Sequence, residues 1–313
     1  MEKQGFLIHS EELTDREVDR LLASGVEVLG IHPTGGKTAT ASLCDLLGKV
    51  RDPDFCARLD RLRRAGIRVE YELHALSWLL PREMFAQRPE WFRMNEAGER
   101  VPDHNLCPSS AEALAFVSDR AAVLARELPS ETGNYYFWID DVRHGACYCP
   151  ACRGLTPSDQ VLLIYHAILR GVRRVDPAAR QCYLAYCETL TPPVSVRPEE
   201  GIFLEYAPID RDTRRPLASP ENAASFAPLP DLLACFGRDH AVALDYWMDN
   251  SLFSRWKKPP VRLEVDFGTV RRDIAAYRDL GFWGVTSFAC FLGDDYVDLW
   301  GEPPLRAYMQ CFQ

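Results

Sequence analysis

The sequence has no long hydrophobic run and no concentration of basic residues. Nowhere in its 313 residues do enough apolar residues follow one another to form a transmembrane helix. Lys and Arg total 36 against 45 Asp and Glu, which gives a net charge of −9. Binding to a nucleic-acid backbone depends on clustered Lys and Arg. We therefore expect neither a membrane nor a nucleic acid as a partner.

The sequence also lacks the segments that divide or export a protein. No Gly/Ser linker or low-complexity tract separates two halves, and 47% of the residues are hydrophobic, so we expect one domain over residues 1–313. Residues 1–5 are polar and charged and show no signal peptide. The eleven cysteines, an odd number, are therefore expected as reduced thiols of a cytoplasmic protein.

Short hydrophobic strands occur eight times, and each runs into a polar or acidic cluster. Helical patterns such as 111–128 and 159–175 separate them. Strands that alternate with helices form parallel sheets, and eight such units predict a closed (β/α)8 TIM barrel. The eight runs are Phe6–His9, Val26–His32, Ile67–His74, Tyr135–Asp141, Gln181–Tyr186, Ile202–Tyr206, Val242–Trp247 and Trp283–Phe288.

Carboxylates stand at the ends of three of these strands. A barrel carries its active site at the carboxyl ends of its strands, so Asp140, Asp141, Glu205 and Asp245 are the candidate catalytic residues. Two carboxylates across a scissile bond are the requirement of glycoside hydrolysis. Neighbours in a strand face opposite ways, so one of Asp140 and Asp141 should reach the pocket. The alternatives are a loop cap and structural ion pairs with arginines such as Arg211.

Histidines and aromatic residues form a second group at the strand ends. His9, His32 and His74 end the first three strands, an arrangement that is compatible with substrate contact or with metal binding. Flat aromatic side chains suit the apolar faces of sugar rings, and packing beneath loops is their ordinary alternative. The candidate substrate-binding residues are His74, Glu72, Trp91, Trp138, Tyr186, Tyr206, Tyr246, Trp247, His9 and His32.

Two loops depart from the repeating pattern. Residues 77–109 form a long insertion after the third strand, and we expect it to fold over the barrel mouth as one wall of the pocket. Ser109 or Ser110 then caps a helix that starts near residue 111. A second loop after the fourth strand contains the cysteine-rich run H-x2-C-x-C-x2-C. The members of this run match the ligand set of a structural zinc site and also suit reduced thiols that pack the loop: His144, Cys147, Cys149 and Cys152.

The segments 88–92, 98–100 and 106–109, together with the cysteine run and residues 184–193, carry a resemblance that extends over residues 66–250. The sequence resembles an uncharacterised bacterial family, a domain of unknown function of the DUF4838 type. That family is grouped with TIM-barrel glycoside hydrolases and is related to the hexosaminidase and α-glucuronidase barrels. Hexosaminidases of the related families carry an Asp-Glu pair after strand four, as general acid (Glu) and orienting residue (Asp). Asp140-Asp141 occupies the matching place here, with a shorter second carboxylate.

We therefore expect a cytoplasmic glycoside hydrolase that acts on a small oligosaccharide or glycoside, hexosaminidase-like or glucuronidase-like. Asp141 is the expected general acid and Asp140 its orienting partner, with Glu205 and Asp245 as candidates for base, nucleophile or support of the cationic ring. Catalysis is expected to need no cofactor. A structural zinc at the cysteine run would serve the fold only. Two alternatives remain: a metal-dependent barrel enzyme that isomerises or hydrolyses a sugar, and a non-catalytic carbohydrate-binding barrel.

Overall fold

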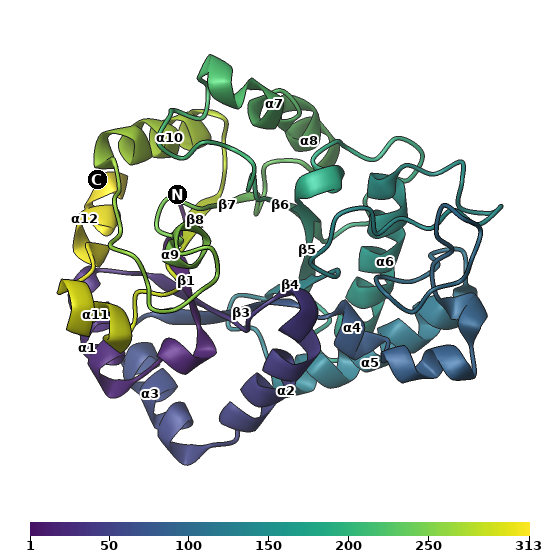
Figure 1. Ribbon diagram of the computed structural model, residues 1–313, viewed down its shortest axis with the longest axis horizontal. Helices are drawn as coiled ribbons and strands as arrows, with labels where there is room; N and C mark the ends of the chain where they lie inside the picture. Colours follow the sequence, from purple (N-terminus) through teal and green to yellow (C-terminus); the bar gives the residue numbers. More distant parts are fainter.

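The computed structural model describes residues 1–313 and contains eight parallel strands that close into a barrel (Figure 1). Each strand pairs with the next one along the chain, and the last pairs with the first. The predicted (β/α)8 barrel is thereby confirmed. The strands are β1 (Lys3–His9), β2 (Val28–His32), β3 (Arg68–His74), β4 (Asn134–Trp138), β5 (Arg180–Ala185), β6 (Ile202–Tyr206), β7 (Val242–Asp245) and β8 (Gly284–Phe288).

Helices surround the ring of strands, as Figure 1 shows. None of them combines the length and the apolar character that a membrane crossing requires. The helices are α1 (Asp15–Ser24), α2 (Ala39–Lys49), α3 (Pro53–Arg64), α4 (Leu76–Leu79), α5 (Ala111–Glu127), α6 (Pro157–Val172), α7 (Ala223–Phe226), α8 (Leu229–Phe236), α9 (Asn250–Phe253), α10 (Phe267–Asp279), α11 (Asp294–Trp300) and α12 (Leu305–Met309).

Side-chain caps set the starts of the two longest helices. The Ser110 hydroxyl accepts the backbone N–H of Ala113 at the start of α5, which confirms the predicted cap. At α6, the Thr156 hydroxyl and the Asp159 carboxylate satisfy each other's backbone N–H groups, with Pro157 in the first turn. These local signals define where the loops after β3 and β4 end.

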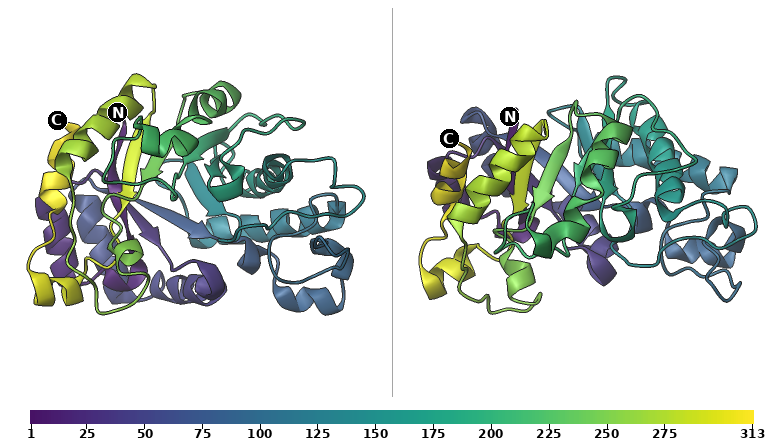
Figure 2. Two further views of the ribbon diagram at one scale, coloured as in Figure 1. Left: turned by 45° about the horizontal axis from the view of Figure 1, so that its top comes forward. Right: turned by 90° about the horizontal axis from the view of Figure 1, so that it is seen from above.

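The insertion between β3 and α5 lies to one side of the barrel, not across its mouth. Figure 2 shows this segment, coloured blue, projecting beside α5 and α6. Trp91 donates from Nε1 to Glu112 and packs against Phe116, and both of these residues belong to α5, so Trp91 holds the insertion against this helix. The loop therefore does not fold over the barrel mouth as predicted: it lines no part of the central cavity there, and it contributes only to a more polar cavity beside it.

A buried lysine occupies the inside of the barrel below the mouth. Lys3 Nζ lies 2.7 Å from Glu70 Oε2 and 2.8 Å from Glu72 Oε1, and it stands 4.1 Å from the centre of the Tyr136 ring. Burial alone lowers the pKa of Lys3, but the surrounding acids, Glu70 and Glu72 first, raise it well above its ordinary value. The lysine is therefore charged, and it neutralises acids that have no access to water.

Glu205 completes this polar floor. Its Oε2 accepts the indole N–H of Trp138 at 2.7 Å. Burial, followed by the charge of Glu72, raises the pKa of Glu205 well above the ordinary value. Burial also raises the pKa of Glu72, although the charge of Lys3 opposes that shift.

Replacement of Lys3 by Met should destabilise the fold strongly. The substitution leaves buried acids without their cation, which costs about 3–5 kcal/mol of unfolding free energy at neutral pH and less in acid, where the carboxyl groups take up protons. Lys49→Met is the control, since its partner Asp45 is largely exposed and the pair should contribute less than about 1 kcal/mol. Chemical denaturation measures both. Equal and small losses would contradict the assignment.

Candidate active site

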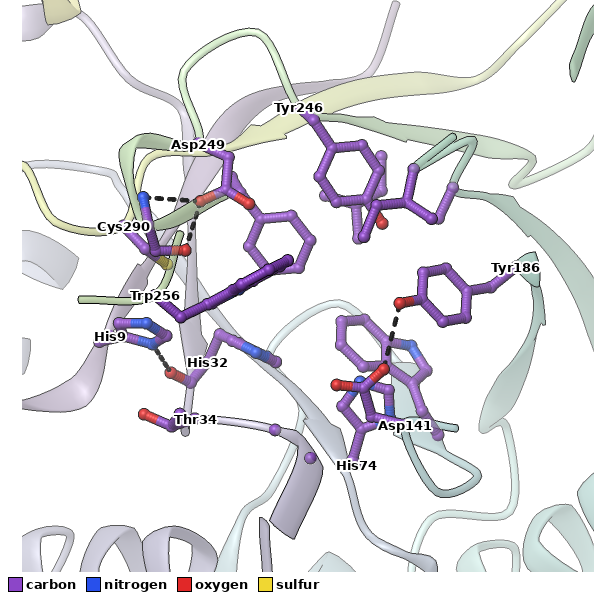
Figure 3. Close-up of a pocket in the computed structure, with 18 of the residues that line it drawn as sticks. His9, His32, Thr34, His74, Asp141, Tyr186, Tyr246, Asp249, Trp256 and Cys290 are labelled. Atoms are coloured by element: carbon purple, nitrogen blue, oxygen red, sulfur yellow. Dashed lines mark hydrogen bonds between the residues drawn. The ribbon is translucent and has the colours of Figure 1, made fainter. Parts of the chain in front are cut away.

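A cavity of about 300 Å³ opens at the carboxyl ends of the strands and is lined by 19 residues (Figure 3). The register places these ends side by side: His9 pairs with His32, and His74 pairs with Trp138. Seven of the candidates from the sequence line the cavity: Asp141, His9, His32, His74, Trp138, Tyr186 and Tyr246.

The other carboxylates from the sequence lie outside this cavity. Glu72 and Glu205 face the barrel interior, where they belong to the floor around Lys3. Asp245 faces the helices: its Oδ2 lies 2.8 Å from Arg211 Nη1 and accepts the Tyr277 hydroxyl at 2.8 Å. This is the structural ion pair that the sequence left open as an alternative. The assignment of Glu72, Glu205 and Asp245 to the pocket is therefore corrected. All three side chains are buried and contact other protein groups instead of the cavity.

Three of the aromatic candidates also pack elsewhere. The Tyr206 hydroxyl donates to the carbonyl of Ser225 at 2.6 Å, and Trp247 Nε1 donates to Asp273 at 3.1 Å, both between the barrel and its helices. Trp91 packs against α5, as described above. All three side chains therefore pack against the surrounding structure, as the alternative from the sequence had it. For Tyr206 the reason is its outward-facing strand position, which meets the helices and not the cavity.

The two adjacent aspartates after β4 have different surroundings. Asp140 is buried and forms an ion pair with Arg82, and its Oδ2 accepts the backbone N–H of Asn105 at 2.6 Å. Asp141 lines the cavity, and its Oδ1 accepts the hydroxyl of Tyr186 at 3.1 Å. Burial first, and then the charge of Asp141, raises the pKa of Tyr186, so this phenol stays a neutral donor.

A glycine from the loop after β2 permits the approach of backbone to Asp141. A Cβ added at Gly35 would come within 2.9 Å of His74 Cδ2 and 3.0 Å of Asp141 Oδ2. Any larger residue at this position must therefore displace one of the two side chains. Sequence reasoning missed this contact, although the adjacent glycines Gly35-Gly36 just after a strand are a usable signal.

A second carboxylate, Asp249, also lines the cavity and was not anticipated. It caps α9 after β7, and its Oδ1 accepts the N–H of Ser251 at 3.1 Å, the hydroxyl of Ser251 at 2.6 Å and the N–H of Leu252 at 3.2 Å. Its Oδ2 accepts no hydrogen bond from the protein. Burial raises the pKa of Asp249, and the donors from Ser251 and Leu252 oppose that shift. Figure 3 shows Asp141 and Asp249 on opposite sides of the cavity.

The three histidines share one hydrogen-bonding pattern. The Nδ1 atoms of His9, His32 and His74 lie 3.0, 2.7 and 2.7 Å from backbone carbonyl oxygens. Because a carbonyl only accepts, each Nδ1 carries the hydrogen, and the Nε2 of each neutral ring is left as an acceptor. The row therefore offers hydrogen-bond acceptors to the cavity.

An exposed tryptophan stands at the mouth of the cavity. Trp256 follows α9, is 64% exposed and yet lines the cavity, where Figure 3 places it between Asp249 and His32. A large aromatic ring left open to water beside a pocket is suited to stacking on the apolar face of a ligand. Its isolated place in a polar loop gave the sequence analysis little to separate it from other tryptophans.

A neighbouring cavity shares part of its wall with the first. Gly36 and Asp141 line both, so the Asp141 side chain stands at the boundary between them. The second cavity is more polar, and its remaining lining comes largely from the insertion after β3 and the loop after β4. These lining residues include Ser77, Arg82, Asp103, His104, Asp140 and Arg143.

The cysteine cluster differs in one member from the predicted set. His144 is 84% exposed, and its Nδ1 lies 3.9 Å from Glu188. In its place stands Cys107 of the insertion, whose sulfur lies near those of Cys147, Cys149 and Cys152. The prediction of His144 as a member of the metal-ligand set is corrected, because its side chain points into solvent. This cluster is also the only group of three or more His, Cys, Asp or Glu whose ligand atoms all lie within 4.8 Å of one another.

The protonation of His32 should make the stability of the protein depend on pH. Burial, and then the rings of His9 and His74, lower the pKa of His32 well below 6.5. Below about pH 6.5 the unfolded chain therefore binds a proton at His32 that the folded protein does not bind. The free energy of unfolding falls as the pH is lowered further, by up to about 1.4 kcal/mol per pH unit. Denaturation of wild type and His32→Asn between pH 7 and 5 should show a larger loss in wild type, because the variant keeps only His166 and His240 as histidines with a lowered pKa. Parallel curves would exclude it.

Comparison with solved structures shows barrels of glycoside hydrolases. An O-GlcNAc hydrolase from Thermobaculum terrenum is similar over 99% of this chain and 59% of its own, with a TM-score of 0.55 and 10% identity. A family 5 glycoside hydrolase from Prevotella bryantii is similar over 96% of this chain and 87% of its own, with a TM-score of 0.53 and 11% identity. A family 42 β-galactosidase is similar over 91% of this chain and 50% of its own, with a TM-score of 0.52 and 12% identity. The chain thus spans about half of the last of these. At such identities the likeness establishes the barrel fold alone.

Comparison with curated proteins gives no match. The sequence profile of one family, described as a domain of unknown function (DUF4838), matches residues 53–230. This span is more than half of the chain, and it contains the insertion after β3, the Asp140-Asp141 pair and all four clustered cysteines. The chain belongs to the DUF4838 family.

Proposed function

We propose that this protein is a glycoside hydrolase that removes a single sugar from a glycoside or a small oligosaccharide. The observation that carries the proposal is the placement of two carboxylates, Asp141 and Asp249, on opposite sides of one cavity at the barrel mouth. Most glycoside hydrolases use such a pair. Because the lining residues come from the strands around the barrel and from the loops that follow them, we also propose that the whole barrel acts as one catalytic domain.

The position of Asp141 suits the general acid. It stands at the boundary between the main cavity and the more polar one beside it. A sugar in the main cavity would extend its leaving group into the second cavity, past the carboxyl group that protonates the departing oxygen. Tyr186 holds Oδ1 by its hydroxyl, so Oδ2 remains for the substrate. Asp140, paired with Arg82, orients the chain that carries Asp141.

The position of Asp249 suits the second carboxylate. Three donors fix Oδ1 and leave Oδ2 for the substrate or for water. A loop cap is the ordinary role of such an aspartate, but a cap needs no access to a cavity. Asp249 acts as the nucleophile if it approaches the anomeric carbon directly, and as the base if one water molecule fits between them.

The lining of the cavity favours an uncharged sugar. A volume of about 300 Å³ suits one ring, and the 19 lining residues include no lysine or arginine. A glucuronide would place its carboxylate beside Asp141 and Asp249 without a cation, which costs free energy. Neutral hexosides and N-acetylhexosaminides avoid this cost. The histidine row would accept sugar hydroxyls, and Trp256 would stack on the ring.

A metal-dependent reaction at the histidines has weaker support. Metal ligands must converge on one point, and the ligand atoms of the histidines and acids of the cavity do not all come within 4.8 Å of one another in any group of three.

Hydrolysis of aryl glycosides should depend on both carboxylates. Asp249→Asn should lower kcat/KM about a hundred-fold or more on every active substrate, because it removes charge from the reacting centre. Asp141→Asn should lower it more on poor leaving groups than on activated ones, since an activated phenolate departs without a proton. Initial rates on N-acetylhexosaminides, glucuronides and neutral hexosides measure these effects.

Two controls accompany this panel. Asp119→Asn removes an exposed carboxylate paired with Arg174, away from both cavities, and should leave the rates unchanged. Glu205→Gln keeps the shape of the buried floor and should retain most of the activity. Loss of activity in Glu205→Gln together with normal rates in Asp249→Asn would overturn the assignment. Sugar binding without turnover in wild type would indicate a binding barrel.

The hydroxyl of Ser251 should set the acid limb of the pH–rate profile. Asp249 must be ionised to act, and Ser251→Ala removes a donor to its ionised form, so the pKa of Asp249 and the acid limb should move upward. Ser251→Thr keeps the hydroxyl and should move it less. The pH dependence of kcat/KM provides the measurement, and an unchanged limb in Ser251→Ala would show that another group titrates there.

A further inference from the structure

Four thiols from two separate loops meet in one buried cluster beside the barrel. Cys107 comes from the end of the insertion after β3, and Cys147, Cys149 and Cys152 come from the loop between β4 and α6. All four are buried, and their sulfur atoms lie within 4.8 Å of one another. Nothing in the proposed hydrolysis uses them.

The separations of the sulfur atoms match a metal centre and not disulfides. Cys107 Sγ lies 3.7 Å from Cys149 Sγ and 3.8 Å from Cys152 Sγ. A disulfide joins its sulfurs at about 2.05 Å. Four sulfurs around a tetrahedral zinc, each at about 2.3 Å from the metal, stand about 3.8 Å apart.

The surroundings of the cluster supply donors to sulfur. The backbone N–H of Met94 donates to Cys147 Sγ at 3.3 Å, and Arg100 Nη1 lies 3.9 Å from the same sulfur. The Ser109 hydroxyl lies 3.0 Å from Cys152 Sγ. Zinc with four thiolates carries a charge of about −2, and donors of this kind stabilise it. Neutral thiols that merely pack need no arginine beside them.

We propose that Cys107, Cys147, Cys149 and Cys152 bind one zinc ion as a closed structural centre. Four thiolates in a tetrahedral arrangement select zinc over the oxygen-preferring cations. With all four positions filled by protein, the metal has no open site for substrate. Its role is to join the insertion after β3 to the loop after β4.

This connection reaches the candidate active site through Asn105. The N–H of Asn105 donates to Asp140 Oδ2 at 2.6 Å, and its Oδ1 accepts the N–H of Asp140 at 3.2 Å. Its Nδ2 donates to the carbonyl of Gly145 at 3.2 Å. Asn105 precedes Cys107 by two residues, and Gly145 precedes Cys147 by two. The zinc centre therefore positions the loop that carries Asp140 and Asp141, although the metal assignment does not rest on the proposed function.

The first test uses wild-type protein purified without chelator from zinc-supplemented cells. Elemental analysis should find one zinc per chain, and X-ray absorption at the zinc edge should find four sulfur ligands at about 2.3 Å. Removal of the zinc should lower the thermal unfolding midpoint, and zinc chloride should restore it. A protein that holds no zinc and takes up none, iron in its place, or two disulfides detected by mass spectrometry would each overturn the proposal.

The second test separates Cys107 from His144 as the fourth ligand. His144→Ala should keep one zinc per chain, and Cys107→Ser should lose it or bind it at least ten-fold more weakly. Cys44→Ser, at an exposed thiol, is the matched control and should keep the metal. Should Cys107→Ser fail to fold, the sulfur count in wild type and the zinc content of His144→Ala still decide. Zinc lost from His144→Ala and kept by Cys107→Ser would overturn the assignment.

Discussion

Closure of the eight strands into one ring is the constraint on which the rest of the structure depends. Within a strand, side chains alternate between the inside of the barrel and the helices, and closure leaves no third direction. His9, His32 and His74 thus meet at the mouth, while Lys3 and Glu72, on the same side of their strands but deeper, form the floor. The cavity at the mouth thus lies above a charged floor.

The same alternation explains how much the sequence could predict. The periodicity of apolar runs suffices for the barrel, because it reports burial directly. It also identifies the histidines, Trp138 and Asp141 as strand-end residues. It does not report depth or direction. Glu205 and Asp245 look alike in sequence, yet one faces the buried floor and the other faces Arg211 outside the barrel.

Residues supplied by loops were the part that the sequence could not place. Asp249 and Trp256 depend on the path of the chain after β7, and Cys107 meets the other cysteines only because the insertion folds beside α5. Such contacts are set by long-range packing, for which no local period exists. The two features they create, a second carboxylate and a cluster of four thiols, changed both the catalytic assignment and the metal assignment.

The central claim is that a single sugar ring binds between Asp141 and Asp249. A crystal structure of the protein with a monosaccharide or an uncleaved glycoside bound tests this claim most directly. The account predicts the ring in the cavity at the barrel mouth, with its anomeric carbon between the two carboxylates and its leaving group directed towards the neighbouring polar cavity. A sugar bound away from both carboxylates would contradict it.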